Sequence, residues 1–251
     1  MDAVRNSMNI HLQSLLTEMS DKSYRSGEWS EGGVYESDET VSWAAYEKAR
    51  QLTETSYLTE LYNLVETSKS DEAKAHAYFI IGFIAKNTND EHATKFLLDR
   101  LKVEKLTSTI NLILHRLADL YKPGHLDLSI IYELINRKGA LTRYAAYLAL
   151  TNTGHSVEDS LIDLLKKTTE REDIVWLIQA LGYVGTEKSI AILETYLKHK
   201  KLRVRETVRD ELVTIMVRAG KPMTEICRLS KMSTQIVESR KERISILTRP
   251  G

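Results

Sequence analysis

Apolar residues recur along this chain with the spacing of an α-helix. Between residues 187 and 219, Ile190, Leu193 and Leu197 follow one another at i, i+3 and i+7, which places them on one helix face. A second stripe follows a short basic turn and consists of Val204, Val208, Leu212 and Ile215. Two striped helices joined by a short turn pack antiparallel and still leave apolar surface for another pair.

Five loop residues divide the chain at nearly constant intervals. They are Asn89, Gly124, Gly154, Gly185 and Gly220, with gaps of 35, 30, 31 and 35 residues. A period in this range is typical of a repeat array. We therefore predict helix pairs over residues 57–88, 90–122, 125–153, 156–184 and 186–219. Glycine at the end of a second helix predicts a left-handed C-cap there.

The segment from Gln179 to Leu212 resembles a HEAT repeat, of the short, armadillo-like variety also found in phycobilin-lyase-like proteins. That family's pattern has an arginine with a small residue three positions later, leucine seven later, and glycines eight and eleven later. Arg143 is followed in this way by Ala146, Leu150 and Gly154, but Thr151 stands at the position of the first glycine. The resemblance covers residues 57–219. It implies an all-α, right-handed α-solenoid, in which Arg143 and Arg205 are structural arginines that bond to the neighbouring repeat.

Residues 1–56 lie outside the repeats and are predicted to form an N-terminal helical cap. Apolar stripes predict helices at residues 2–19 and 39–54, with a polar, aromatic-bearing loop at 20–38 between them. Terminal repeats of such arrays are atypical and polar on the outside. Trp29 in this loop either is buried as the loop folds back or contacts a partner, as interface tryptophans do.

Residues 220–251 allow two interpretations. They form a closing helix pair of the stack, or residues 224–237 form a helix-turn-helix that binds DNA. The charge distribution bears on this choice, because residues 198–251 hold 14 basic and 6 acidic side chains, whereas residues 1–72 hold 6 and 14. In the DNA-binding alternative Arg240, Lys241 and Arg243 would contact phosphates.

Composition narrows the class of protein. The chain has no apolar run of signal-peptide or membrane-spanning type, so we expect a cytoplasmic protein without membrane contact. The single Cys227 agrees with a reducing compartment and is expected to serve packing. Neither phosphate-binding loops nor metal or nucleophile motifs are present. We therefore expect no metal and no cofactor. Of the two alternatives, the sequence favours a protein without enzymatic activity over an enzyme.

The most informative surface pattern is on the predicted second helix of residues 156–184. Asp173 and Trp176 lie one turn apart, and Gln179 and Tyr183 continue the same stripe, away from the apolar one. Arg203 and Arg209 would flank this stripe from the next repeat.

These residues, together with Trp29, favour a non-enzymatic protein-binding scaffold or adaptor that holds a partner on its concave face. Assembly factors and toxin-sequestering immunity proteins belong to this class. The alternative is a nucleic-acid-binding protein that uses the basic C-terminal third. HEAT-like alkylpurine DNA glycosylases use an aspartate with nearby tryptophans, which Asp173 and Trp176 resemble. A chromophore or modification lyase is implied by the family resemblance alone.

Overall fold

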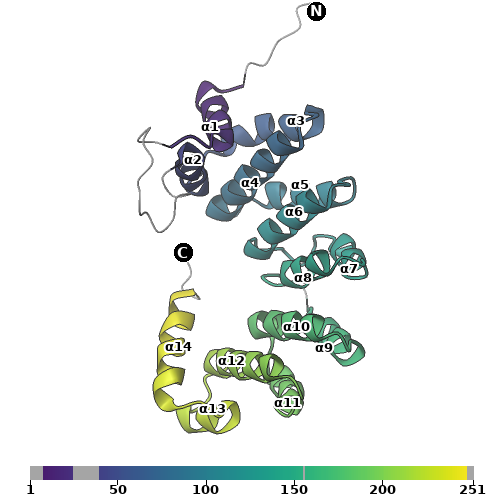
Figure 1. Cartoon of the computed structure of the whole chain (residues 1–251), viewed down its shortest axis with the longest axis vertical. Coiled ribbons are helices and arrows are strands. Elements are labelled where there is room, and N and C mark those ends of the chain that lie inside the picture. Colours follow the sequence, from purple (N-terminus) through teal and green to yellow (C-terminus); the bar gives the residue numbers. More distant parts are fainter. Residues whose placement is uncertain (1–7, 25–39, 155, 248–251) are drawn as a thin grey trace, which may run out of the picture. The chain divides into compact units, whose positions relative to one another are not determined.

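The computed structural model describes residues 8–24, 40–154 and 156–247 (Figure 1). Over these residues the protein is all-helical, with fourteen α-helices and no strand, which confirms the predicted all-α class. An isolated β-bridge joins Tyr24 and Thr40. The chain divides into two compact units, residues 1–130 and 131–251, and the division falls within α7 (Ser129–Ile135).

The first unit is built around one long helix, α4. The other helices of this unit are α1 (Ile10–Ser20), α2 (Val41–Arg50), α3 (Leu58–Thr67), α4 itself (Asp71–Thr88), α5 (Glu91–Leu101) and α6 (Thr107–Asp119). Helix α4 contacts all five of the others. Its start is fixed by Ser70, whose hydroxyl accepts a hydrogen bond from the amide of Ala73 at 3.2 Å. Because it is surrounded on several sides, its apolar residues Ile80, Ile81 and Ile84 are fully buried.

The second unit has two central helices, α10 and α12. Its helices are α8 (Ala140–Ala149), α9 (Glu158–Lys167), α10 (Arg171–Val184), α11 (Glu187–Tyr196), α12 (Leu202–Arg218), α13 (Met223–Ser230) and α14 (Thr234–Leu247). Helix α10 contacts α8, α9 and α12, and α12 contacts α11, α13 and α14. Consecutive second helices therefore lie side by side, as Figure 1 shows for α8, α10 and α12.

The apolar stripes predict the core well. All four residues of the α12 stripe are buried, as are Ile190 and Leu193 of α11. Helices occupy all five predicted repeat pairs. In the N-terminal segment, the described helices begin later than predicted, at Ile10 and Val41, and Leu52 lies beyond the end of α2. Trp29 lies outside the described residues.

The helix ends correct one prediction. Gly220 has the expected left-handed conformation, with φ of 68°, and Asn89 adopts the same conformation, with φ of 52°. Gly124 does not have a positive φ, and neither does Gly185, whose φ is −66°. Its lack of a side chain serves a close approach instead, since a Cβ there would lie 2.6 Å from the carbonyl oxygen of Leu181 and 2.7 Å from Oγ of Ser189.

Two glycines let long side chains cross between second helices. A Cβ on Gly82 of α4 would lie 2.6 Å from Cγ and Cδ of Arg116 and 2.8 Å from its Cβ. In the second unit, the carboxyl group of Glu211 on α12 occupies the space that a Cβ on Gly182 of α10 would fill. In both units a charged side chain of one second helix therefore lies directly on a glycine of the preceding one.

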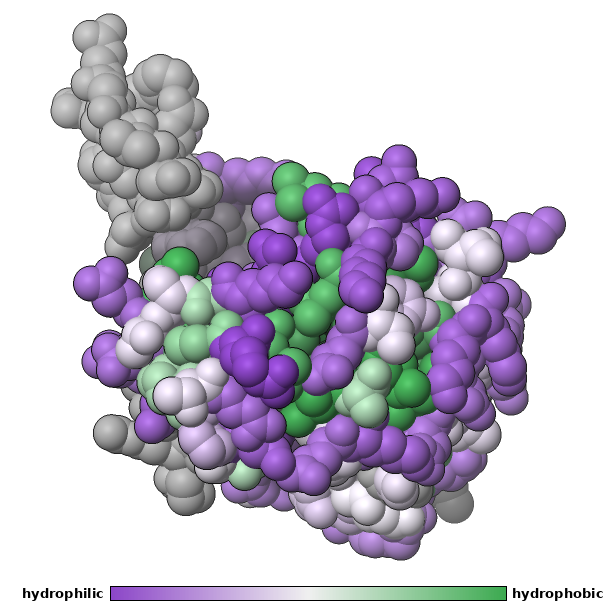
Figure 2. All heavy atoms as spheres, turned by 90° about the horizontal axis from the view of Figure 1, so that it is seen from below, coloured by the Kyte–Doolittle hydropathy of each residue, from purple (hydrophilic) through white to green (hydrophobic). Residues whose placement is uncertain are grey.

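The C-terminal pair packs on α12. Helices α13 and α14 both contact it, and Arg240 of α14 forms an ion pair with Asp210 at 2.7 Å. The turn between them has Lys231 in the left-handed conformation, with φ of 57°. Seen from this end of the second unit, hydrophobic residues gather in the middle of the surface and hydrophilic ones border them (Figure 2). The end of the unit is therefore not wholly polar.

We expect Gly82→Ala to destabilise the protein by about 1–3 kcal/mol, because the new methyl group would overlap the stem of Arg116. Helix propensity alone would stabilise the variant by about 1 kcal/mol. Urea denaturation of the variant and of a control, Gly139→Ala, measures this difference. The nearest atom to a Cβ at Gly139 lies 3.7 Å away, so the control should change little. Equal stability of Gly82→Ala and the wild type would contradict the close approach.

Burial of its carboxyl group and, after it, the neighbouring charge of Asp210 raise the pKa of Glu211 to about 7. Between pH 4.5 and 7 the folded protein therefore binds more protons at this site than the unfolded chain, so this group's contribution to stability decreases as pH rises.

We expect Glu211→Gln to remove that decrease. Its stability relative to wild type should rise from pH 4.5 to 7 by up to about 3 kcal/mol, at about 1.4 kcal/mol per pKa unit, and then stay constant. Chemical denaturation at a series of pH values measures this. A constant difference across the range would show that Glu211 is ionised normally.

Candidate protein-binding surface

An aromatic stack marks the exposed side of the second helices in the second unit. We call this side of α8, α10 and α12 the second-helix face. Trp176 of α10 stacks on Tyr144 of α8, with ring centroids 5.3 Å apart and planes inclined by 19°. Both side chains are half-buried. Each ring therefore holds the other in place while part of its surface stays accessible.

The aromatic stripe continues along α10. Gln179 is half-buried and Tyr183 is 65% exposed. With Trp176 they stand at i, i+3 and i+7 of one helix, so the three lie on one face. The structure thus brings together three of the residues that the sequence singled out.

Asp173 belongs to the interior. It is only 6% exposed, and its carboxylate accepts hydrogen bonds from Nε of Arg143 at 3.3 Å and from Nη2 at 3.2 Å. Burial alone would lower the pKa of Arg143, but the bonds to Asp173 outweigh it and raise that pKa. Asp173 thus ties α10 to α8, and is unsuited to the partner contact we predicted for it.

The two predicted structural arginines make the same local contacts. Nη1 of Arg143 donates to the carbonyl oxygens six and five residues earlier, at 3.1 and 2.8 Å. Nη1 of Arg205 does the same, at 2.7 and 3.1 Å. Each therefore fixes the turn that precedes its own helix. The predicted bond to a neighbouring pair is confirmed for Arg143, through Asp173.

The two remaining predicted residues differ in accessibility. The side chain of Arg203 is 58% exposed and pairs with Glu172 of α10 at 3.3 Å. Arg209 is half-buried, and its Nε is buried without a hydrogen-bond partner among the described residues. A buried N–H group can donate to a partner's oxygen only if that oxygen displaces neighbouring atoms, so Arg203 is the more accessible cation.

Sequence reasoning missed Tyr144 and two exposed leucines. Leu141 at the start of α8 is 72% exposed, and Leu202 at the start of α12 is 56% exposed. Tyr144 follows Arg143 directly, and alignment of the repeats would have placed it beside α10. A stack between two helices leaves no periodic signal in the sequence of either helix.

Within the described part of the chain, no group of three metal-ligating side chains could hold an ion. No helix among those residues combines the length and the apolar character needed to cross a membrane. No protein-family model matches the chain, and no curated protein matches it.

We expect Arg143→Ala to destabilise the protein by about 3 kcal/mol, because it leaves the buried carboxylate of Asp173 without a partner. Arg203→Ala is the matched control. It breaks a pair whose arginine is more than half exposed, so it should change stability by less than about 1 kcal/mol. Urea denaturation of both variants measures the difference, and similar values for the two would contradict the assigned roles.

Proposed function

We propose that the protein is a non-enzymatic binding protein that holds a protein partner on its second-helix face. The observation that carries this proposal is the half-buried Tyr144–Trp176 stack. Aromatic side chains supply much of the binding energy of protein interfaces, and they do so best where they are rigid and partly desolvated before the partner arrives. Stacking provides that rigidity here.

The surroundings of the stack are suited to an interface. Tyr183, Leu141 and Leu202 expose apolar area on the three neighbouring helices. Arg203 and Glu172 add a polar border. An apolar centre with a polar rim is the usual anatomy of a protein interface.

We further infer that the helix pairs form a HEAT-like, right-handed solenoid. Two features support it: consecutive second helices contact one another within each unit, and the first helices α9 and α11 also touch. Curved stacks of this kind present extended surfaces to partners, as scaffolds, assembly factors and immunity proteins require.

Nucleic-acid binding is less well supported. Much of the basic charge of the C-terminal third is already used inside the protein. Arg240 pairs with Asp210, and Arg218 donates to the carbonyl oxygens of Gly182 and Tyr183 at 2.9 and 2.8 Å. Arginines held by protein oxygens have fewer donors left for phosphates.

Affinity capture from a lysate of the source organism, followed by mass spectrometry, tests the protein-binding proposal. We expect the wild type to retain a partner protein. The variants Trp176→Ala and Tyr144→Ala should capture at least about tenfold less of it, as expected when an interface hot spot is removed. Trp43→Ala is the control, because Trp43 is an exposed tryptophan of the first unit, 38% accessible.

Equal capture by wild type and both stack variants would contradict the proposal. A titration of binding to duplex DNA at increasing salt concentration tests the alternative, nucleic-acid binding. Measurable binding at low salt that weakens steeply as salt rises would support phosphate contacts.

A further inference from the structure

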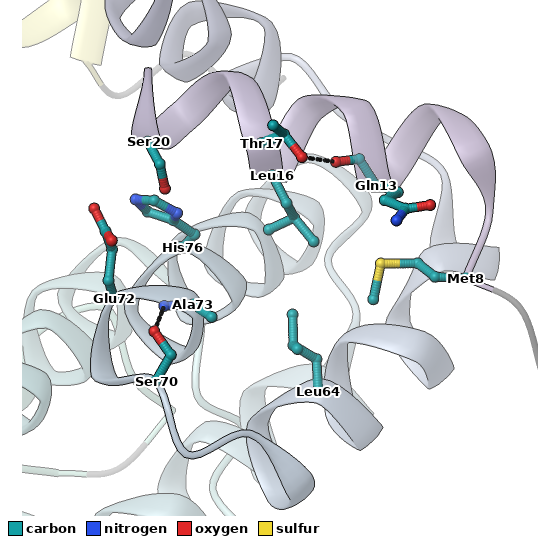
Figure 3. A pocket seen from close by; sticks show the side chains of 10 residues that line it. All are labelled: Met8, Gln13, Leu16, Thr17, Ser20, Leu64, Ser70, Glu72, Ala73 and His76. Atoms are coloured by element: carbon teal, nitrogen blue, oxygen red, sulfur yellow. Dashed lines mark hydrogen bonds between the residues drawn. The ribbon is translucent and has the colours of Figure 1, made fainter. Parts of the chain in front are cut away.

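The first unit contains a cavity between α1 and the α3–α4 pair (Figure 3). It is open to solvent on one side, where the exposed Ser20 and Glu72 lie, and has a volume of about 390 Å³, which is within the usual range for small-molecule sites. None of the residues considered for the second-helix face lines it. The cavity therefore requires an explanation of its own.

One end of the cavity is polar. Ser20 from α1 and Glu72 and His76 from α4 line it, and their polar tips point toward one another (Figure 3). Glu72 and His76 are four residues apart on α4 and so share a helix face. Burial lowers the pKa of His76, and the charge of Glu72 opposes this decrease. The imidazole is therefore neutral at pH 7 and can accept a hydrogen bond.

The other end is apolar. Leu16 and Leu64 face each other across the cavity, and the thioether of Met8 lies beside them (Figure 3). All three side chains are half-buried. A ligand that fills this end would remove apolar surface from water, at about 25 cal/mol for each Å².

The carboxylate of Glu72 is the only acidic group that lines the cavity. Among the described residues, no basic side chain forms an ion pair with it, although Glu18 and Glu47 nearby in the unit are paired with Lys48 and Arg50. Its charge also contributes to the raised pKa of Tyr46, after burial. Tyr46 contacts the His76 ring edge-on at 5.8 Å. The negative charge therefore acts on this end of the cavity without a compensating cation.

We propose that this cavity binds an organic cation with an apolar body. The ammonium or guanidinium group would lie between Glu72, His76 and Ser20, and the body would pack between Leu16 and Leu64. A carboxylate, a neutral imidazole and a hydroxyl together offer acceptors for several N–H donors. An anion would be repelled by the charge of Glu72, so we expect carboxylate and phosphate ligands to bind more weakly than a cation.

The test compares three probes of similar shape: 2-phenylethylammonium, 2-phenylethanol and 3-phenylpropanoate. Binding is followed by chemical-shift changes of the backbone amides of Ala73 and His76 in the full chain. We expect the amine to bind at least about tenfold more tightly than the alcohol, and the acid to bind more weakly than either. Equal affinity for amine and alcohol would overturn the proposal.

Glu72→Gln gives the decisive variant, because it removes the charge and keeps the shape. Its affinity for the amine should fall to that for the alcohol, while its affinity for the alcohol stays unchanged and shows that the cavity is intact. The control is Glu66→Gln, which removes an exposed carboxylate of α3 outside the cavity. An unchanged affinity of Glu72→Gln for the amine would contradict the assignment.

The cation could belong to a lysine of a partner protein or to a free amine. The peptide acetyl-Phe-Lys-Phe-amide, compared with the same peptide containing norleucine, distinguishes these sources. Tighter binding of the lysine peptide than of 2-phenylethylammonium assigns the pocket to a protein segment, and weaker binding assigns it to a small amine. Equal affinity for the two peptides also assigns the pocket to a small amine, because the lysine side chain then adds nothing to binding. The cavity and the second-helix face lie in different units, so neither test depends on the other.

Discussion

The close packing of consecutive second helices is the constraint on which each unit depends. A helix such as α10 contacts its partner α9 and both neighbouring second helices, so most of its circumference is buried. Such a helix cannot carry large side chains on every inner position. Gly182 under the carboxyl group of Glu211, and Gly82 under Arg116, show how the conflict is resolved. A residue without a side chain faces a long one, and interior density is kept without a cavity.

This packing also decides which residues remain available for binding. On α10 only a narrow strip is left, and Trp176, Gln179 and Tyr183 occupy it. Asp173 is one turn before Trp176, yet the bonds with Arg143 place it inside. A buried carboxylate must be paired, because an uncompensated charge in the interior is strongly unfavourable. The pairing joins α8 to α10 and so supports the stack of Tyr144 on Trp176.

The sequence predicts the helices and their buried stripes, because a period of 3.6 residues is a local property. The family resemblance predicts structural roles for Arg143 and Arg205, and the expected bond to a neighbouring pair is present for Arg143. The sequence does not predict what depends on contacts between distant residues. Three features depend on residues that belong to different helices. They are the stack of Tyr144 on Trp176, the pairing that buries Asp173, and the position of Ser20 and His76 at one end of the cavity. Gly185 illustrates the same limit, since its role follows from the proximity of Ser189 and not from the backbone angles of a cap.

The distribution of charge along the chain is a poor guide to the charge that a partner meets. By count, the C-terminal third is basic and the first 72 residues are acidic. In the folded protein, however, Arg205, Arg218 and Arg240 are bound to carbonyl oxygens or to a carboxylate. Glu72 lines a cavity and has no ion-pair partner among the described residues. Arginines that already donate to oxygens within the fold have fewer N–H groups left for a ligand, whereas the carboxylate of Glu72 keeps its acceptor sites. The carboxylate without an ion-pair partner in the described part of the chain thus lies in the acidic first unit, and the partly accessible aromatic stack lies in the second.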